Sequence, residues 1–263
     1  MYKLVFSLAL TLVLGTQAVQ AQKAPNTTTP KSPASGGNLT KADLLAFKKG
    51  AYNNSLRYLD YGTATQNVVD ILTISPDAVE WKDTLCLLYF NRQMYPQTLL
   101  LTDELLKAKP QDAKALEMQA IAYDALGGHK QALEAYEKLY VISKDINHLY
   151  QVAGHQFDLA RIGECNQTLD AIMKSPEAEK ATVSLNFGRN EQQTVPMKAA
   201  IYNMRGVIAQ SLKQDAAAKQ NFEEALKVYP DFVLAKGNLE ALTQLPEDSN
   251  QLNHLPEDPG KPK

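Results

Sequence analysis

The sequence has few of the residues and motifs that mark catalysis, metal binding or nucleic-acid binding. Its 263 residues include 2 cysteines and 1 tryptophan, and the formal net charge is −2 at pH 7. A chain without a basic excess provides no electrostatic field for nucleic acid. There is no glycine-rich phosphate loop, no Gly-x-Ser-x-Gly elbow and no His-Glu-x-x-His pair. We therefore expect no enzyme, no cofactor and no nucleic-acid partner.

A long apolar run is also missing. Leu4–Leu14 is apolar but shorter than the roughly 20 residues that a membrane span needs. Lys3 precedes this run and residues 19–21 fit a small-x-small cleavage site, so residues 1–21 are predicted to be a secretory signal peptide; an N-terminal helix of the fold is the alternative. No cysteine follows the cleavage site, which argues against a lipid anchor there. We expect an exported protein, periplasmic or secreted from a bacterial envelope, that begins at Gln22 and has no membrane span.

Both ends of the remaining chain lack a core-forming pattern. Residues 22–39 are rich in Thr, Pro, Ser, Gly and Lys, and are predicted to form a flexible linker. Residues 244–263 are predicted to form a disordered tail. This tail contains Leu-Pro-Glu-Asp twice, at 245–248 and 255–258. The doubled motif is either a short linear ligand for another protein or part of a featureless tail.

The informative part of the chain is the segment 199–232. Small and apolar residues recur there at three- and four-residue steps, which is typical of two amphipathic helices. Residues 213–215 interrupt the pattern between the helices, and Pro230 ends it. Gly206 and Ala218 are expected to face each other, so that the two backbones approach closely. The periodic positions are Tyr202, Gly206, Ala209 and Leu212 in the first helix, and Ala218, Phe222, Ala225 and Leu226 in the second.

The same pattern recurs upstream at a step of 34 residues. Pro76 and Pro110 are 34 residues apart, and three repeats run in register at about 45–78, 79–112 and 113–146. The order of aromatic, small residue, alanine, aromatic and proline resembles the tetratricopeptide repeat. This resemblance implies an all-α fold over residues 40–243: a right-handed superhelical solenoid of about five helix pairs, closed by a capping helix at 233–243. It also implies a scaffold for protein–protein interaction, whose concave groove binds a peptide or a partner helix.

The fourth repeat is interrupted by an insertion. Its first helix is predicted near Asn147–Ile162 and its turn at Gly163-Glu164, after which residues 177–197 depart from the repeat. Residues 182–187 alternate polar and apolar and are followed by turn residues, which predicts a β-hairpin near 182–195; an irregular surface loop is the alternative. The hairpin either pairs through a strand edge with a partner or packs on the last repeat.

The resemblance also assigns residues to the groove, because first helices line the concave side in this family. Most of the charges in this set are carboxylates, so a basic or amphipathic segment of another protein is the expected partner. The alternative is that these are solvated helix faces and that the convex side or the hairpin binds. The groove residues are Lys49 and Asn53; Glu80, Asp83, Leu87 and Phe90; Glu117, Ile121 and Asp124; His148, Gln151, His155 and Asp158; and Asn203, Val207 and Gln210.

Two further features invite other chemistry. His148, His155 and Asp158 fall on one helix face, so an enzyme or metal-binding protein that uses this face or the hairpin region is the alternative function. Solvated groove residues are the preferred interpretation, and no metal is predicted. Cys86 and Cys165 lie two repeats apart, farther than the roughly 7 Å that a disulfide permits, so both are expected to be free thiols.

Overall fold

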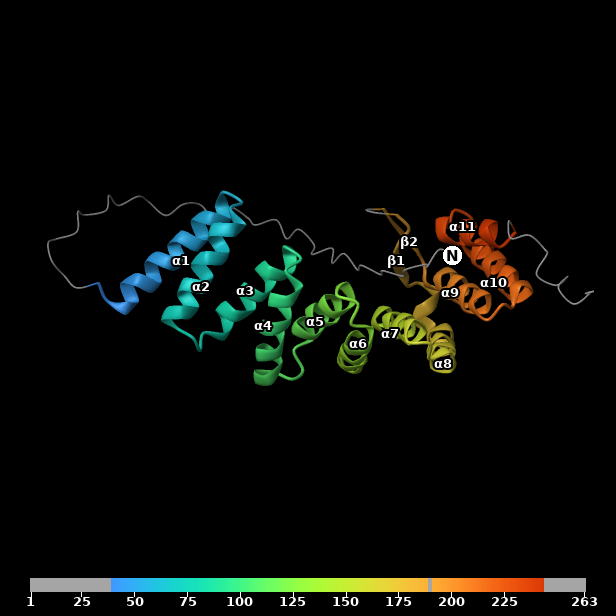
Figure 1. Ribbon diagram of the computed structural model, residues 1–263, viewed down its shortest axis with the longest axis horizontal. Coiled ribbons are helices and arrows are strands. Elements are labelled where there is room, and N and C mark those ends of the chain that lie inside the picture. The colour runs from blue at the N-terminus through green and yellow to red at the C-terminus, as the bar shows by residue number, and fades with distance from the viewer. Residues whose placement is uncertain (1–38, 189–190, 244–263) are drawn as a thin grey trace, which may run out of the picture. The chain divides into compact units, whose positions relative to one another are not determined.

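The computed structural model describes residues 39–188 and 191–243. The predicted signal peptide 1–21, nearly all of the predicted linker 22–39, and the predicted tail 244–263 lie outside the described residues. The chain divides between Lys144 and Asp145 into two compact units, and Figure 1 labels their helices and strands. Unit 1 ends at Lys144 and unit 2 begins at Asp145.

Unit 1 consists of three helix pairs in sequence order. Each helix packs against the next one along the chain, both within a pair and between pairs. This arrangement confirms the predicted in-register repeats. The helices are α1 (Lys41–Arg57), α2 (Tyr61–Ile74), α3 (Val79–Asn91), α4 (Tyr95–Ala108), α5 (Ala113–Ala125) and α6 (His129–Ser143).

Polar side chains before several helices define where those helices begin. Thr40 forms a capping box with Asp43, in which each side chain bonds to the backbone N–H of the other residue. Asp60 and Asp112 accept backbone hydrogen bonds at the starts of α2 and α5. These contacts satisfy N–H groups that have no partner within the helix.

The first helix of every pair ends in the same motif. In the third pair, Gly127 N–H donates to the Asp124 carbonyl at 2.9 Å and Gly128 N–H donates to the Tyr123 carbonyl at 2.8 Å. These two bonds define a Schellman motif, and equivalent bonds occur at the other four turns. One residue in each turn has a positive φ: Leu59 (57°), Gln93 (57°), Gly127 (75°), Ala160 (57°) and Lys213 (58°).

Side chains of neighbouring first helices contact one another in unit 1. Tyr52 on α1 meets Trp81 on α3 edge to face, with ring centroids 5.2 Å apart. Cys86 on α3 lies 4.0 Å from Met118 on α5, measured from Sγ to Sδ. Cys86 and Ala120, which occupy the predicted small-residue slots, are both fully buried. The first helices α1, α3 and α5 therefore form one continuous face.

Unit 2 contains two helix pairs, a hairpin and a final helix. The hairpin lies between the two pairs, where the insertion was predicted, and a short 3-10 helix precedes it. The elements are α7 (Ile146–Asp158), α8 (Ile162–Lys174), η1 (Pro176–Glu179), β1 (Thr182–Asn186), β2 (Gln192–Pro196), α9 (Met197–Ser211), α10 (Asp215–Val228) and α11 (Val233–Thr243).

The predicted turn at Gly163-Glu164 is wrong. Both residues lie inside α8, and the turn is formed by residues 159–161, with Ala160 in the left-handed conformation. Arg161 N–H bonds to the Gln156 carbonyl at 2.8 Å and so satisfies the end of α7. The turn is placed by the carbonyls that need partners at the helix end, not by the nearest glycine.

The hairpin confirms the predicted strand periodicity. β1 and β2 pair antiparallel, with Val183 opposite Val195. Val183, Leu185 and Val195 are buried on one face, and Ser184 and Thr194 hydroxyls lie 2.9 Å apart on the other. An apolar face that is buried and a polar face that is not are the usual result of alternation in a two-stranded sheet.

Gln193 attaches the hairpin to the loop before α11. Its Nε2 donates to the Asp231 carbonyl at 2.7 Å, and its Oε1 accepts from Val233 N–H at 2.9 Å. The amide thus pairs with the backbone as a neighbouring strand would. These contacts favour the packing role for the hairpin; pairing of its edge with a partner stays a prediction.

Candidate partner-binding surface

The first helices of unit 1 bring nine of the predicted groove residues onto adjacent helices. We call this surface the first-helix face. Lys49, Asn53 and Glu80 are exposed, and Ile121 is buried. The other five are half-buried, which suits side chains at the floor of a surface. The nine residues are Lys49 and Asn53 on α1; Glu80, Asp83, Leu87 and Phe90 on α3; and Glu117, Ile121 and Asp124 on α5.

Aromatic rings border this face. Lys49 Nζ lies 5.7 Å from the centroid of the Trp81 ring, within the range of a cation–π contact. Phe90 meets Tyr95 edge to face, with centroids 6.4 Å apart. Trp81 and Tyr95 were not among the predicted groove residues, because neither occupies a groove slot of the repeat. The sequence does contain one signal for Trp81, because it is the single tryptophan of the chain and tryptophan is enriched at binding surfaces.

Leu87 and Phe90 supply the apolar part of the face. Both are partly exposed and pack on the buried cluster that contains Cys86, Leu105 and Met118. Their inner surfaces are therefore held by the core, while the outer surfaces remain available. A fixed apolar side chain loses little entropy when a partner covers it.

Two carboxylates on α3 lack an ion pair within the described part of the chain. Glu80 and Asp83 are three residues apart and so share a side of the helix. Lys82, which lies between them, instead pairs with Glu104 on α4 at 2.7 Å. Burial, followed by the charge of Asp83, raises the pKa of the Cys86 thiol to about 12. The first-helix face thus carries uncompensated negative charge beside apolar side chains.

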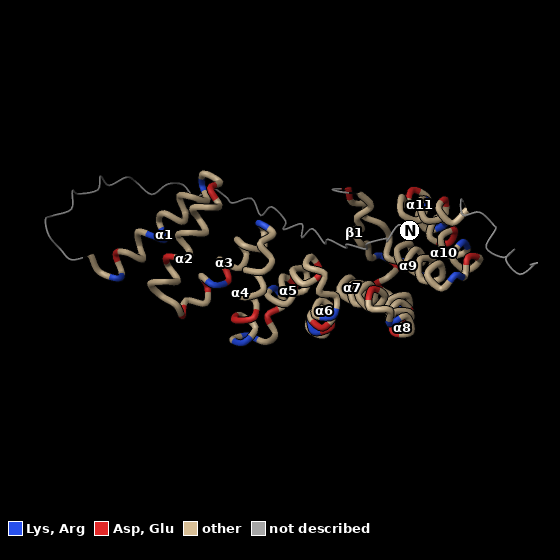
Figure 2. Tube along the Cα trace, in the orientation of Figure 1, with Lys and Arg blue, Asp and Glu red and all other residues tan. Residues whose placement is uncertain are grey.

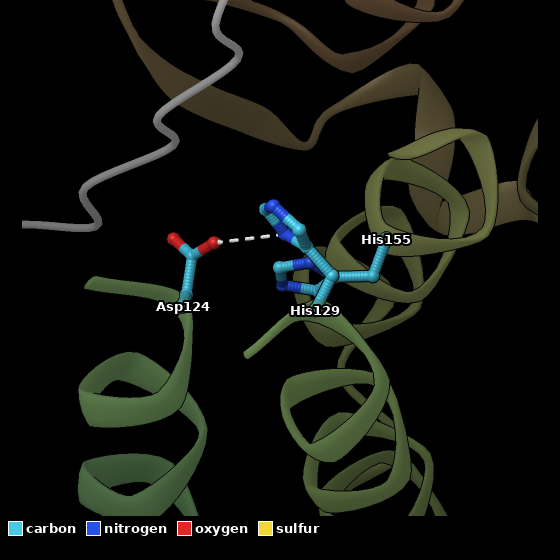
Figure 3. A group of neighbouring side chains, drawn as sticks. All are labelled: Asp124, His129 and His155. Atoms are coloured by element: carbon cyan, nitrogen blue, oxygen red, sulfur yellow. Dashed lines mark ion pairs between the residues drawn. The ribbon is translucent and has the colours of Figure 1, made fainter. Parts of the chain in front are cut away.

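Asp124 has a partner within unit 1. Its Oδ1 lies 3.8 Å from Nδ1 of His129, which begins α6, as Figure 3 shows. The turn between α5 and α6 brings the two side chains together. This contact is an ion pair when the imidazole is protonated. His155, drawn in the same figure, belongs to α7 of unit 2.

The predicted groove residues of unit 2 are largely buried. Gln151, His155, Asn203 and Val207 are 2%, 4%, 1% and 6% exposed, and Gln210 is partly exposed. The preferred interpretation of His155 as a solvated groove residue is therefore wrong, and Gln151, Asn203 and Val207 do not provide an accessible groove surface either. Asn203 shows one reason, because Asn238 on α11 donates to its Oδ1 at 2.9 Å.

His148, His155 and Asp158 of α7 are the residues for which a metal site was the alternative. His155 Nδ1 lies 3.7 Å from Asp158 Oδ2, and His148 is half-buried. Burial lowers the pKa of His148. Among the described residues, His148, His155 and Asp158 do not converge as three ligands.

Two buried amides in unit 2 each leave a donor unused. Gln151 Nε2 and Asn203 Nδ2 have no hydrogen-bond partner among the described residues. A buried donor without an acceptor costs about 1–3 kcal/mol. Both are first-helix residues at predicted groove positions. Their unpaired donors lower the stability of unit 2, and the two side chains provide no exposed surface for a partner.

Charged residues of both signs are distributed along the helices. Figure 2 shows Lys and Arg interspersed with Asp and Glu along the helices. Among residues 39–188 and 191–243, no helix is both long and apolar enough to cross a membrane. Both cysteines are buried free thiols.

Comparison with solved structures shows the fold. A structure of MamA protein aligns over 72% of this chain and 93% of its own, with 10% identity and a TM-score of 0.55. The structure of YrrB, described as a TPR protein with an unusual peptide-binding site, aligns over 76% of this chain and 92% of its own, with 14% identity and a TM-score of 0.56. No protein-family model and no curated protein matched the sequence. At these identities the common feature is the array of helix pairs.

Proposed function

We propose that this chain, whose fold is of the tetratricopeptide type, is a protein-interaction scaffold that binds its partner on the first-helix face of unit 1. The observation that carries the proposal is the position of Leu87 and Phe90, half-exposed and held by the core, beside the unpaired Glu80 and Asp83. The peptide-binding site named for YrrB supports the extension of peptide binding to this chain. Catalysis is not part of the proposal.

The partner is proposed to be a peptide or helix segment that carries apolar side chains and at least one Lys or Arg. The apolar side chains would cover Leu87 and Phe90, and the cation would meet Glu80 and Asp83. Exposed charge pairs contribute mostly to the association rate and to specificity, and they weaken as salt screens them. Binding should therefore weaken as the ionic strength rises.

A charge-reversal pair tests this surface against a matched control. Glu80→Lys with Asp83→Lys reverses two charges three residues apart on the first-helix face. Glu134→Lys with Glu137→Lys makes the same change at the same spacing on α6, where both side chains are exposed. Proteins retained on the wild-type chain and on the control, but not on the first-helix variant, are identified by mass spectrometry.

Affinity of a partner found in this way is then measured at two ionic strengths. We expect the first-helix variant to bind at least tenfold more weakly at low salt, and the difference to shrink at high salt. Equal binding of wild type and both variants would contradict the proposal and would direct attention to the hairpin or the second-helix side.

We also propose that the chain is exported to a bacterial envelope. The support is the sequence of residues 1–21, with Lys3, the apolar run and the cleavage site at residues 19–21. N-terminal sequencing of the protein from its native source tests it. A mature chain that begins at Gln22 is expected, and a chain that begins at Met1 would contradict export.

A further inference from the structure

A second surface of unit 1 has the opposite chemistry to the first-helix face. At the turn between α1 and α2, Tyr58, Leu59 and Tyr61 are 73%, 70% and 48% exposed. Single exposed apolar residues are common, but three within four positions form a patch. Leu59 is also held at a φ of 57°, where glycine is less strained. The patch therefore adds exposed apolar surface at a strained turn.

A cavity adjoins this patch. It has a volume of about 270 Å³ and is lined by Tyr61, Leu88, Asn91 and Arg92. Leu88 supplies a buried apolar floor, and Asn91 and Arg92 supply polar groups at the end of α3. Such a site can take one apolar side chain or ring and hold a polar group beside it.

Two arginines make this surface basic. Arg57 ends α1 and Arg92 is the C-cap of α3; both are exposed and neither forms an ion pair within the described residues. The one side-chain bond of Arg92 is a 3.5 Å contact from Nη1 to Thr65 Oγ1. Asp60, the acid in this turn, is engaged in capping α2 through a 3.0 Å bond from Thr63 N–H. The guanidinium donors therefore remain available for a carboxylate.

The sequence of the tail matches these groups. Residues 245–248 and 255–258 each present leucine, proline, glutamate and aspartate in the same order. Leucine or proline fits the apolar patch and cavity, and two adjacent carboxylates fit Arg57 and Arg92. A proline in each copy lowers the conformational entropy that binding costs.

We propose that the Leu-Pro-Glu-Asp segments of a second copy of this chain bind the surface formed by Arg57, Tyr58, Leu59, Tyr61 and Arg92. One residue separates the end of α11 at Thr243 from the first segment, and eleven separate it from the second. The two segments in one tail can also act together through effective concentration.

Sedimentation of the full chain without the predicted signal peptide tests the association. We expect the weight-average mass to rise between about 1 and 200 μM protein, a range suited to weak exposed contacts. Two variants should remain monomeric: Arg57→Glu with Arg92→Glu, and a tail variant with Glu247→Gln, Asp248→Asn, Glu257→Gln and Asp258→Asn. A matched control, Lys130→Glu with Lys138→Glu on the exposed side of α6, should associate as wild type does.

Mixing the two monomeric variants gives the deciding result. The arginine variant keeps an intact tail and the tail variant keeps an intact binding surface, so the mixture should associate although neither does alone. Monomeric wild type at every concentration would overturn the proposal, as would association that persists in the arginine variant. Binding of a labelled peptide of residues 244–263 to the tail variant, with wild type monomeric, would show docking within one chain and would also overturn it.

Discussion

Gly206 on α9 lies directly against the ring of Phe222 on α10. A Cβ atom built on Gly206 would be 2.3 Å from Phe222 Cε1 and 2.4 Å from Cδ1. Phe222 is fully buried and so has little room to move away. The expected neighbour was Ala218; the atoms nearest to Gly206 belong instead to an aromatic ring one turn farther along α10. The absence of a side chain at Gly206 makes room for that ring.

We expect Gly206→Ala to destabilise the protein by about 1–3 kcal/mol, because the methyl group would overpack the core against Phe222. Gly154→Ala is the matched control. Gly154 occupies the same slot of the repeat on α7, and a Cβ there meets nothing within 4 Å. Alanine should instead stabilise α7 by up to about 1 kcal/mol through its helix propensity. Urea unfolding measures both; the same sign of change for the two variants would contradict the packing.

The turn residues with positive φ predict a second pair of effects. Ala160→Gly should stabilise the protein by about 0.5–1 kcal/mol, because glycine relieves the left-handed strain at φ 57°. Gly127→Ala should destabilise it by about 1 kcal/mol for the same reason. Thermal melts of both variants test the assignment. A lower melting temperature for Ala160→Gly would indicate that residue 160 is helical and that the turn lies elsewhere.

Gln193 should matter for stability although it is only half-buried. Gln193→Ala removes both bonds to the loop before α11 and should cost about 1–2 kcal/mol. Gln193→Glu keeps the acceptor for Val233 N–H but places a carboxylate oxygen beside the Asp231 carbonyl, so it should cost more than alanine does. Equal stability of all three proteins in urea would mean that the hairpin does not depend on this contact.

A deletion distinguishes whether the hairpin stabilises unit 2 or binds a partner. Replacement of residues 182–195 with a short Gly-Ser turn removes the buried side chains of Val183, Leu185 and Val195. If the hairpin only packs on unit 2, stability falls and a partner identified on the first-helix face still binds. Loss of that binding in a chain that remains folded would support strand-edge recognition instead.

The thiols should be unreactive in the folded protein. Burial raises the pKa of both Cys86 and Cys165 to about 12, so neither is a thiolate near neutral pH. A thiol reagent at pH 8 should label both cysteines only after unfolding. Rapid labelling of either cysteine in the native protein would contradict its burial.

The same shifts predict alkaline destabilisation. The unfolded thiols lose their protons near their ordinary pKa of 9.0 and the folded thiols near 12, so the unfolded state binds fewer protons between these values. Stability from this source is fully present below pH 9 and falls as the pH rises toward 12. Burial raises the pKa of Tyr136 and Tyr150 as well, which acts in the same direction. Melting temperatures from pH 7 to 10.5 should decline only in the alkaline part of the range.

The helix pairs and the hairpin were predictable because their signals are local. Residues such as Tyr202 and Ala209 recur with the period of a helix, and Val183 and Leu185 recur with the period of a strand. The step of 34 residues then predicts where each helix pair lies along the chain. The turn at Ala160 was not predicted, because Gly163 was taken as the turn residue. The repeat spacing indicates the correct position, since Ala160 lies 33 residues after Gly127.

Exposure was not predictable, because it depends on which elements pack on a helix after the chain has folded. Equivalent first-helix slots are exposed at Lys49 and buried at Asn203, and Asn203 is covered by Asn238 from α11. A repeat pattern assigns a residue to a side of its helix, but it contains no information about what lies on that side. The sequence alone therefore determined the helix pairs, their order and the inserted hairpin. The tertiary structure decided which slots remain accessible and which ring occupies the space beside Gly206, since both depend on side-chain packing between elements far apart in the chain.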